Sequence, residues 1–218
     1  MTTLYKATRP DGKDFCTGTI NYAAALESGE VVRHPRPAKL IGWESGATAA
    51  GYLSVSTVPT DCIGARWPCR LFEVEAVGRA CLDDRHASKR RVKALRVVRE
   101  LPAADTLGPQ GVHVAALLEQ CGRLTGSEFR SAKSAWTTAW TDAWTASQAE
   151  AWTADGTARG AAWDVVWNVA WSLCDAAEGA AFALLVRDLI STEHYDTLTM
   201  PWRQTIGRIH PDDPEVAR

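Results

Sequence analysis

Alternating apolar and polar positions mark the first half of the chain. In residues 70–78, RLFEVEAVG, the apolar side chains Phe72, Val74 and Ala76 lie on one face of an extended chain, and Glu73 and Glu75 lie on the other. This pattern predicts a half-buried strand. Similar patterns predict short strands at LYKA near the N-terminus, at YLSVSTV and, because of its β-branched content, at RRVKALRVVREL.

Between these strands, the segment INYAAALESG predicts a short helix that stops at Gly29. Residues 31–51 mix prolines, glycines and small side chains, and they predict a long loop.

Helical periodicity replaces the alternation after residue 110. In GVHVAALLEQCGRL, Val114, Leu117, Leu118 and Cys121 share one helical face, and Gly122 is expected to end the helix. Thr125 and Glu128 then form the pattern of a capping box at the start of an alanine-rich segment. This segment carries seven of the ten tryptophans, most of them four residues apart: Trp136, Trp140, Trp144, Trp152, Trp163, Trp167 and Trp171.

The tryptophan spacing also bears on how the helical segment folds. Each four-residue step advances a side chain by about 40° around a helix, so one straight helix would turn the two tryptophan triplets to opposite sides. Asp155, Gly156 and Gly160 stand between the triplets, and a break there would bring both stripes into one interface. We therefore predict a helical hairpin, with one long continuous helix as the alternative.

The predicted fold is α+β, with a small antiparallel or mixed sheet as the head and an Ala/Trp-rich helical hairpin as the tail. The predicted head covers residues 1–110, a connecting helix covers 111–126, and the tail covers 127–192. Residues 193–218 are expected to form short helices and a frayed end, with Ser191 or Thr192 as one cap and Pro201 starting the last element.

The tryptophans must be buried somewhere, because each can bury about 150–250 Å² and seven exposed rings would exceed the apolar patch that a monomer carries. The stripe is therefore predicted to be a core or an interface with other copies or with a host protein.

Charge divides the chain in the same way as hydrophobicity. Residues 1–110 hold 16 Lys and Arg against 12 Asp and Glu, whereas residues 127–190 hold 4 against 8. Seven cations and no acid fall between Arg85 and Arg99. Such a run is typical of a solvated face, and it also allows nucleic-acid binding, with phosphate contacts from Lys89, Arg90, Arg91, Lys93 and Arg96.

Several classes of protein are disfavoured. The six cysteines and five histidines show no zinc-site spacing, and neither a GxGxxG nor a GxxxxGK[ST] loop occurs, so no metal or cofactor is expected. No stretch reaches 18 uninterrupted apolar residues, and the N-terminus lacks the apolar run of a signal peptide. We expect a cytoplasmic protein with reduced thiols and no membrane contact.

Taken together, the segments quoted above, with TVPTDC, WPCRLF and VRDLISTEHYDTLTMPWR, resemble an uncharacterised family of phage and actinobacterial proteins. The resemblance covers nearly the whole chain. It implies a phage-encoded protein acting in the host cytoplasm, with a constant head and a repeat of variable length, and it implies no activity.

A second resemblance concerns enzymes. Arg9, the segment Ser54-Val-Ser56-Thr57 and the pair Glu73 and Glu75 resemble the arginine, Ser-Thr-Ser and Glu-x-Glu elements of ADP-ribosyltransferases. The resemblance implies that Arg9 would clamp cofactor phosphate and that Glu75 would stabilise an oxocarbenium-like transition state, with Ser56 beside them. The favoured function remains a non-catalytic interaction or assembly protein.

Overall fold

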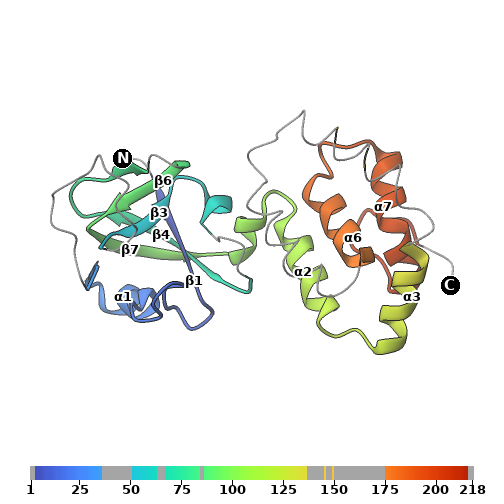
Figure 1. The fold of residues 1–218 in the computed structure, drawn as a ribbon, viewed down its shortest axis with the longest axis horizontal. Coiled ribbons are helices and arrows are strands. Elements are labelled where there is room, and N and C mark those ends of the chain that lie inside the picture. Colours follow the sequence, from blue (N-terminus) through green and yellow to red (C-terminus); the bar gives the residue numbers. More distant parts are fainter. Residues whose placement is uncertain are drawn as a thin grey trace. The chain divides into compact units, whose positions relative to one another are not determined.

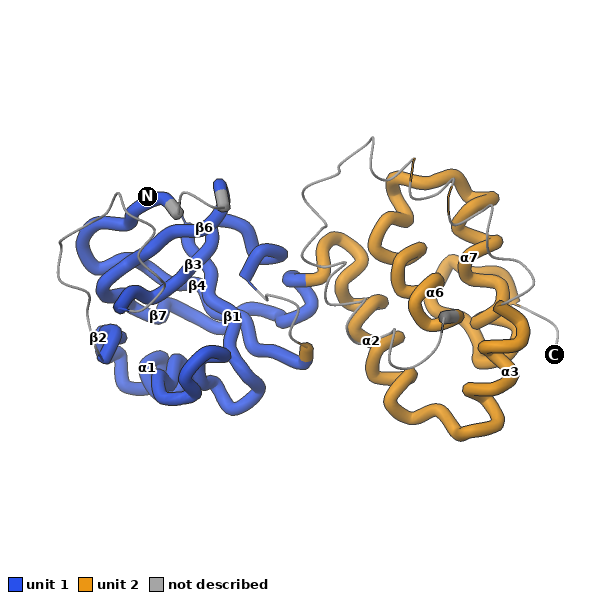
Figure 2. The backbone as a smooth tube through the Cα atoms, in the orientation of Figure 1, with its two compact units in different colours: residues 1–63, 68–106 blue, residues 64–67, 107–218 orange. Residues whose placement is uncertain are grey.

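The computed structural model describes residues 3–35, 51–62, 67–83, 86–136, 145, 149 and 175–215. The chain divides into two compact units (Figure 2). Unit 1 comprises Met1–Ile63 and Pro68–Thr106, and unit 2 comprises Gly64–Trp67 and Leu107–Arg218.

Unit 1 is built on a seven-stranded antiparallel sheet (Figure 1). The strands lie in the order β2-β7-β4-β1-β3-β6-β5. Their bounds are β1 Leu4–Thr8, β2 Val31–Arg33, β3 Leu53–Ser56, β4 Arg70–Ala76, β5 Cys81–Asp83, β6 His86–Val92 and β7 Ala94–Leu101. The first strand of the chain therefore lies at the centre of the sheet, between β3 and β4.

Strands β6 and β7 are two parts of one bent segment. Only Lys93 separates them, yet β6 pairs with β3 and β5, whereas β7 pairs with β4 and β2. The segment thus joins strands that lie apart in the sheet order, which requires the sheet to curl strongly. The predicted strand over RRVKALRVVREL is confirmed, and its division at Lys93 is new.

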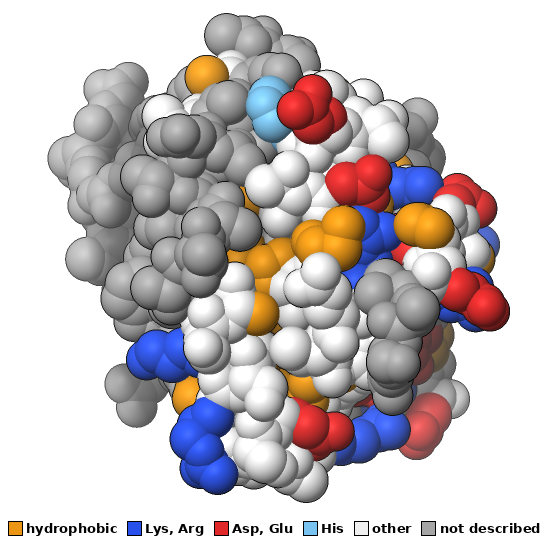
Figure 3. All heavy atoms as spheres, turned by 90° about the vertical axis from the view of Figure 1, so that its right-hand side faces the viewer, with side chains coloured by type: hydrophobic (Ala, Val, Ile, Leu, Met, Phe, Trp, Pro, Cys, Tyr) orange, Lys and Arg blue, Asp and Glu red, His pale blue; other side chains and the backbone are white. Residues whose placement is uncertain are grey.

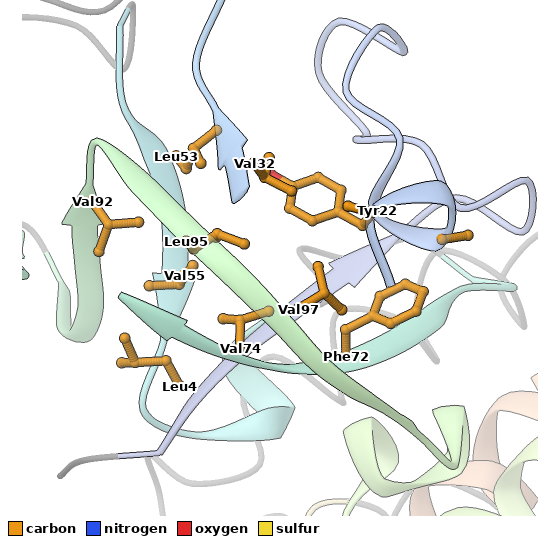
Figure 4. Close-up of a cluster of buried hydrophobic side chains, with 12 residues drawn as sticks. Leu4, Tyr22, Val32, Leu53, Val55, Phe72, Val74, Val92, Leu95 and Val97 are labelled. Atoms are coloured by element: carbon orange, nitrogen blue, oxygen red, sulfur yellow. The ribbon is translucent and has the colours of Figure 1, made fainter. Parts of the chain in front are cut away.

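The curled sheet encloses one apolar cluster (Figure 4). Alternate residues of the strands point into it, among them Val55, Phe72, Val74 and Leu95, each at most 2% exposed. Helix α1 (Tyr22–Ser28) packs against β7, and its Tyr22 ring reaches over the sheet toward Val32 in Figure 4. The predicted helix and its stop are confirmed, because Gly29 caps α1 with φ 71°.

The loop between β1 and α1 is held by one buried carboxylate. Asp14 accepts backbone N–H groups of Cys16, Thr17, Thr19 and Ile20 at 2.6–3.1 Å. Burial alone would raise the pKa of Asp14, but the hydrogen bonds from Thr17 and Ile20 outweigh it and lower this pKa to about 2. The loop is therefore ordered around an ionised group.

Unit 2 is helical in its described part. It contains α2 (Gly111–Cys121), α3 (Gly126–Trp136), α6 (Asp175–Leu185) and α7 (Thr192–Thr205). The predicted helix over α2 is confirmed, with Val114, Leu117, Leu118 and Cys121 buried at 0–5% exposure. The predicted capping box before α3 is also confirmed, because the Thr125 N–H donates to the Glu128 carboxylate at 2.8 Å.

Trp136 lies in the core of unit 2. It is 3% exposed, and its six-membered ring fills the space beside Gly179 of α6 that a Cβ would occupy. The neighbouring face of α6 consists of small residues, including Ala176, Ala180 and Ala183, all fully buried. This one tryptophan is therefore a packing residue within the chain. The other six predicted stripe residues lie outside the described residues, as do positions 155–160.

The predicted fold class is wrong. The chain does not divide into a sheet head and a helical hairpin, because the helices are spread along it, with α1 packed against the sheet of unit 1. In unit 2, α6 contacts α2 and α7 as well as α3. Small residues on several faces of α6 allow this close packing on more than one side, which a hairpin with a single tryptophan interface does not require.

Three local predictions are also corrected. The predicted loop over residues 31–51 begins with β2, because Val31–Arg33 find a partner in β7. Pro201 does not start a new element but lies inside α7, which Ser191 caps by accepting the His194 N–H. The predicted frayed end is ordered up to residue 215, and within it His210 and Asp213 are 8% and 4% exposed.

Candidate functional site

The two glutamates of the enzyme hypothesis lie on the outer face of the sheet and face cations. Glu73 lies opposite Arg99 in the β4–β7 pair, and their side chains form an ion pair at 2.8 Å. Glu75 lies opposite Arg96 in the same pair. Cross-strand pairs of opposite charge are a common way to stabilise a solvated sheet face.

The structure places Arg9 far from Glu75. Thr8 lies opposite Arg70 and Leu4 opposite Val74, so Arg9 and Glu75 lie at opposite ends of the β1–β4 pair, about 20 Å apart along the strands. Arg9 forms an exposed ion pair with Asp11 at 3.2 Å. These positions do not converge on one point where a cofactor could sit.

Ser56 has a structural role. Its side chain is fully buried, and its hydroxyl accepts the Val58 N–H at 3.1 Å and donates to the Ser88 carbonyl at 3.4 Å. It thereby fixes the chain where β3 leads into the short 3₁₀ helix η1 (Pro59–Asp61).

The basic run spans the bend between β6 and β7. In the β7 half, the cations face glutamates, as described above. In the β6 half, Lys89 lies opposite Ser56, and Arg91 lies between Ser54 and Cys81. Lys93 occupies the bend, and Arg90 donates to the backbone carbonyls of Ala87 and Lys89 at 2.6 and 2.8 Å. The cross-strand neighbours of Lys89 and Arg91 in β6 are thus serine and cysteine, and the Lys89 ammonium donates to the Asp61 carbonyl.

The thiols of Cys62, directly after η1, and of Cys69, directly before β4, do not have the properties of nucleophiles. Burial raises the pKa of Cys62 to about 11, and burial also raises the pKa of Cys69 to about 11. Both groups are therefore protonated at neutral pH, whereas the thiolate is the reactive form.

A groove along one edge of the sheet was not predicted. Its volume is about 460 Å³, and it lies between α1 and the edge strand β2. We call it the α1–β2 groove; its lining includes Ile20, Ala24, Ala25, Ser28, Val31 and Pro35. The sequence did not reveal the groove because residues 31–51 predict a loop. The three residues of β2, which form one wall of the groove, are too short a run for a sequence pattern to identify as a strand.

Unit 2 carries a cluster of polar side chains where the end of the chain folds back. His210 lies against the ring of His113, with ring centroids 4.3 Å apart, and against Arg187, whose Nη1 is 2.9 Å from its Nε2. Asp213 accepts the Tyr195 hydroxyl at 2.9 Å. These residues come from four separate segments, so the sequence offered no spacing by which to group them.

Arg203 adds a buried cation to this cluster. Its side chain is fully buried, with Nη2 at 2.8 Å from Asp196 and Nη1 at 3.9 Å from Asp213. Two carboxylates thus compensate one guanidinium. On the face of unit 2 in Figure 3, acidic and basic side chains are interspersed around a band of hydrophobic ones.

The described part of the chain contains neither a metal-binding cluster nor a membrane-spanning helix. There, no three His, Cys, Asp or Glu side chains come close enough together to hold a metal ion. Over the same residues, no helix has both the length and the apolar character needed to cross a bilayer.

Comparison of the chain with protein-family models, with curated proteins and with solved structures finds no match. The resemblance to a phage and actinobacterial family therefore stays a prediction.

Proposed function

We propose that the protein is a non-catalytic interaction protein that binds an extended segment of another polypeptide in the α1–β2 groove. The observation that carries this proposal is the groove itself, because it runs beside a strand at the edge of the sheet. By contrast, Glu73 of the enzyme hypothesis pairs with Arg99 across the sheet, Arg9 forms an exposed pair with Asp11, and Ser56 accepts the Val58 N–H.

An edge strand presents backbone donors and acceptors on its outer side, and an added strand can pair with them. Here the opposite wall of the groove consists of small side chains, Ala24, Ala25 and Ser28, which leave room for the side chains of the added strand. Ile20, Val31 and Pro35 supply apolar contacts. The groove therefore suits an extended peptide with apolar side chains of moderate size.

The partner is a second copy of the chain or a host protein in the cytoplasm, which would be the host cytoplasm if the protein is phage-encoded. The tryptophan repeat is the second element of this proposal, as a surface for self-association. The buried position of Trp136 supports packing within the chain for its first member.

Peptide binding in the α1–β2 groove is tested by selecting peptides from a displayed random library on the wild-type protein and on the variant Ala24→Arg. Ala24 is exposed and lines the groove, so an arginine there fills the groove without entering the core. The matched control is Val112→Arg, which adds the same charge at a position 67% exposed in unit 2.

We expect peptides enriched on the wild type to bind Val112→Arg equally well and to bind Ala24→Arg at least about tenfold more weakly, a difference near 1.4 kcal/mol. A library that enriches nothing on the wild type, or enriched peptides that bind Ala24→Arg normally, would refute the proposal.

Nucleic-acid binding through β6 is a second candidate, and the strand register favours it. Lys89 and Arg91 have serine and cysteine as cross-strand neighbours, Lys89 also donates to the Asp61 carbonyl, and Lys93 follows them. A phosphate backbone passing over β3 and β6 would meet these cations beside the small side chain of Ser54, which is exposed.

This candidate is tested with labelled single-stranded and double-stranded oligonucleotides over a range of salt. Removing one cation that touches a phosphate should reduce the salt slope of log Kobs by about 0.7–0.9. The double variant Arg91→Glu, Lys93→Glu should bind more weakly with a shallower slope, and the control Arg123→Glu, Lys133→Glu in unit 2 should not. Binding that is absent, or equal in both variants, rejects the candidate.

A further inference from the structure

The C-terminal segment of unit 2 is held against the helices of that unit by contacts on both sides of one histidine, His210. From residue 207 the chain turns back, and His210 becomes 8% exposed. Its neighbours are His113 from α2, Arg187 from the segment after α6, and Asp212 and Asp213 from its own segment. Tyr195 and Arg203 of α7 join through Asp213.

Both ring nitrogens of His210 face hydrogen-bond donors. Nδ1 accepts the backbone N–H of Asp212 at 3.1 Å, and Nε2 is 2.9 Å from Nη1 of Arg187, which can only donate. A neutral imidazole has one lone pair to offer, so it can satisfy one of the two donors. An imidazolium has none, and its charge would lie next to the Arg187 guanidinium.

The acidic neighbours, Asp212 and Asp213, would favour a protonated His210. Both carboxylates, however, already have other ion-pair or hydrogen-bond partners. The Asp212 carboxylate is 3.5 Å from Nδ1 and is paired with Arg187 at 3.0 Å. The Asp213 carboxylate accepts the N–H groups of Ile209 and His210 at 3.1 and 2.9 Å, as well as the Tyr195 hydroxyl. Burial is the largest cause that lowers the pKa of His210, followed by Arg187 and His113, and together they outweigh the two carboxylates.

We propose that residues 207–213 form a C-terminal latch that is closed on unit 2 at neutral pH and is released on acidification by protonation of His210. A histidine whose pKa is lowered by docking stabilises the docked state above its unfolded pKa, near 6.5, and this stabilisation disappears as the pH falls toward the docked pKa. Release uncovers Tyr195, 5% exposed, and Arg203, 1% exposed, on α7. Acidification would thus open a surface carrying an aromatic ring and a guanidinium.

Hydrogen exchange of the full chain between pH 7 and pH 5, corrected for the intrinsic rate, tests the latch. The amides of Ile209 and His210, which donate to Asp213, should become about tenfold less protected over this range, while the amides in the middle of α7 stay protected. His210→Gln keeps a hydrogen-bonding side chain that cannot be protonated, and it should retain protection at pH 5. The control His194→Gln, at a half-exposed position of α7, should behave like the wild type.

Constant protection in the wild type, or an unchanged pH midpoint in His210→Gln, would overturn the proposal. If His210→Gln fails to dock at pH 7, an NMR titration of the His210 ring in the wild type decides instead. Its midpoint must then coincide with the decrease in amide protection, and a ring that titrates while the two amides remain protected overturns the latch.

Discussion

The ring of Trp136 lies directly against the backbone of Gly179, where the side chain of any other residue would begin. This contact joins α3 to α6 and depends on the absence of a Cβ at the middle of a helix.

Gly179→Ala should therefore destabilise the protein, although alanine is the better helix former by about 1 kcal/mol. The added methyl group overlaps the buried ring, and overpacking of this kind costs about 1–3 kcal/mol. Urea denaturation monitored by fluorescence measures the change. Gly126→Ala is the control, because its Cβ would meet only the Arg130 side chain at 3.6 Å. Equal stability of the two variants would show that Trp136 does not rest on Gly179.

Asp14→Asn should destabilise unit 1 by about 2–3 kcal/mol at pH 7, since the amide cannot accept all the N–H groups that the carboxylate accepts. The pKa of Asp14 is lowered from 3.8 to about 2 on folding, so the ionised group stabilises the fold above pH 4. The stability difference between the wild type and Asp14→Asn should shrink as the pH falls from 4 to 2. Urea titrations of both proteins at several pH values measure this difference in the free energy of unfolding. A difference independent of pH would contradict the stabilising role of the ionised Asp14.

Two tyrosines should respond differently to removal of the hydroxyl group. In the described part of the chain, the Tyr22 hydroxyl is buried with no hydrogen-bond partner, whereas the Tyr195 hydroxyl donates to Asp213 at 2.9 Å. Tyr22→Phe should leave the free energy of unfolding unchanged or raise it by about 1 kcal/mol, and Tyr195→Phe should lower it by about 1–2 kcal/mol. Thermal unfolding of both variants provides the comparison, and destabilisation of the same size in both would refute the difference.

Incubation with NAD should release nicotinamide only at the background rate, because Arg9 and Glu75 lie at opposite ends of the β1–β4 pair. Glu75→Ala should give the same rate as the wild type. The measurement is nicotinamide release followed by chromatography in the presence and absence of a cell extract. Release that depends on Glu75 would restore the enzyme hypothesis.

Local structure in this chain was largely predictable from the sequence. The alternation in RLFEVEAVG, the spacing from Val114 to Cys121 and the Thr125 cap all correspond to observed elements, because each depends on neighbouring residues alone. Pro201 is the exception. It predicts a helix start, but packing of α7 against α3 and α6 outweighs the hydrogen bond that proline cannot make.

Tertiary relations were not predictable in the same way. Nothing in β2 indicates that it pairs with β7, and the fold class failed because a tryptophan stripe fixes which residues are buried but not which helix covers them. The candidate sites show the same limit. The groove depends on where α1 lies beside an edge strand, and the polar cluster of unit 2 depends on a C-terminal segment whose composition predicts a frayed end.

The sheet order also has a consequence for how the chain is made. Strands β1 and β2 leave the ribosome before their partners: among the described residues β2 pairs with β7, and β1 pairs with both β3 and β4. Unit 1 therefore cannot complete its sheet until Leu101 has been synthesised. Until then its apolar strands stay exposed, and they depend on fast translation and on chaperones to avoid aggregation. A ribosome that stalls before this codon leaves an incomplete sheet that proteases can degrade.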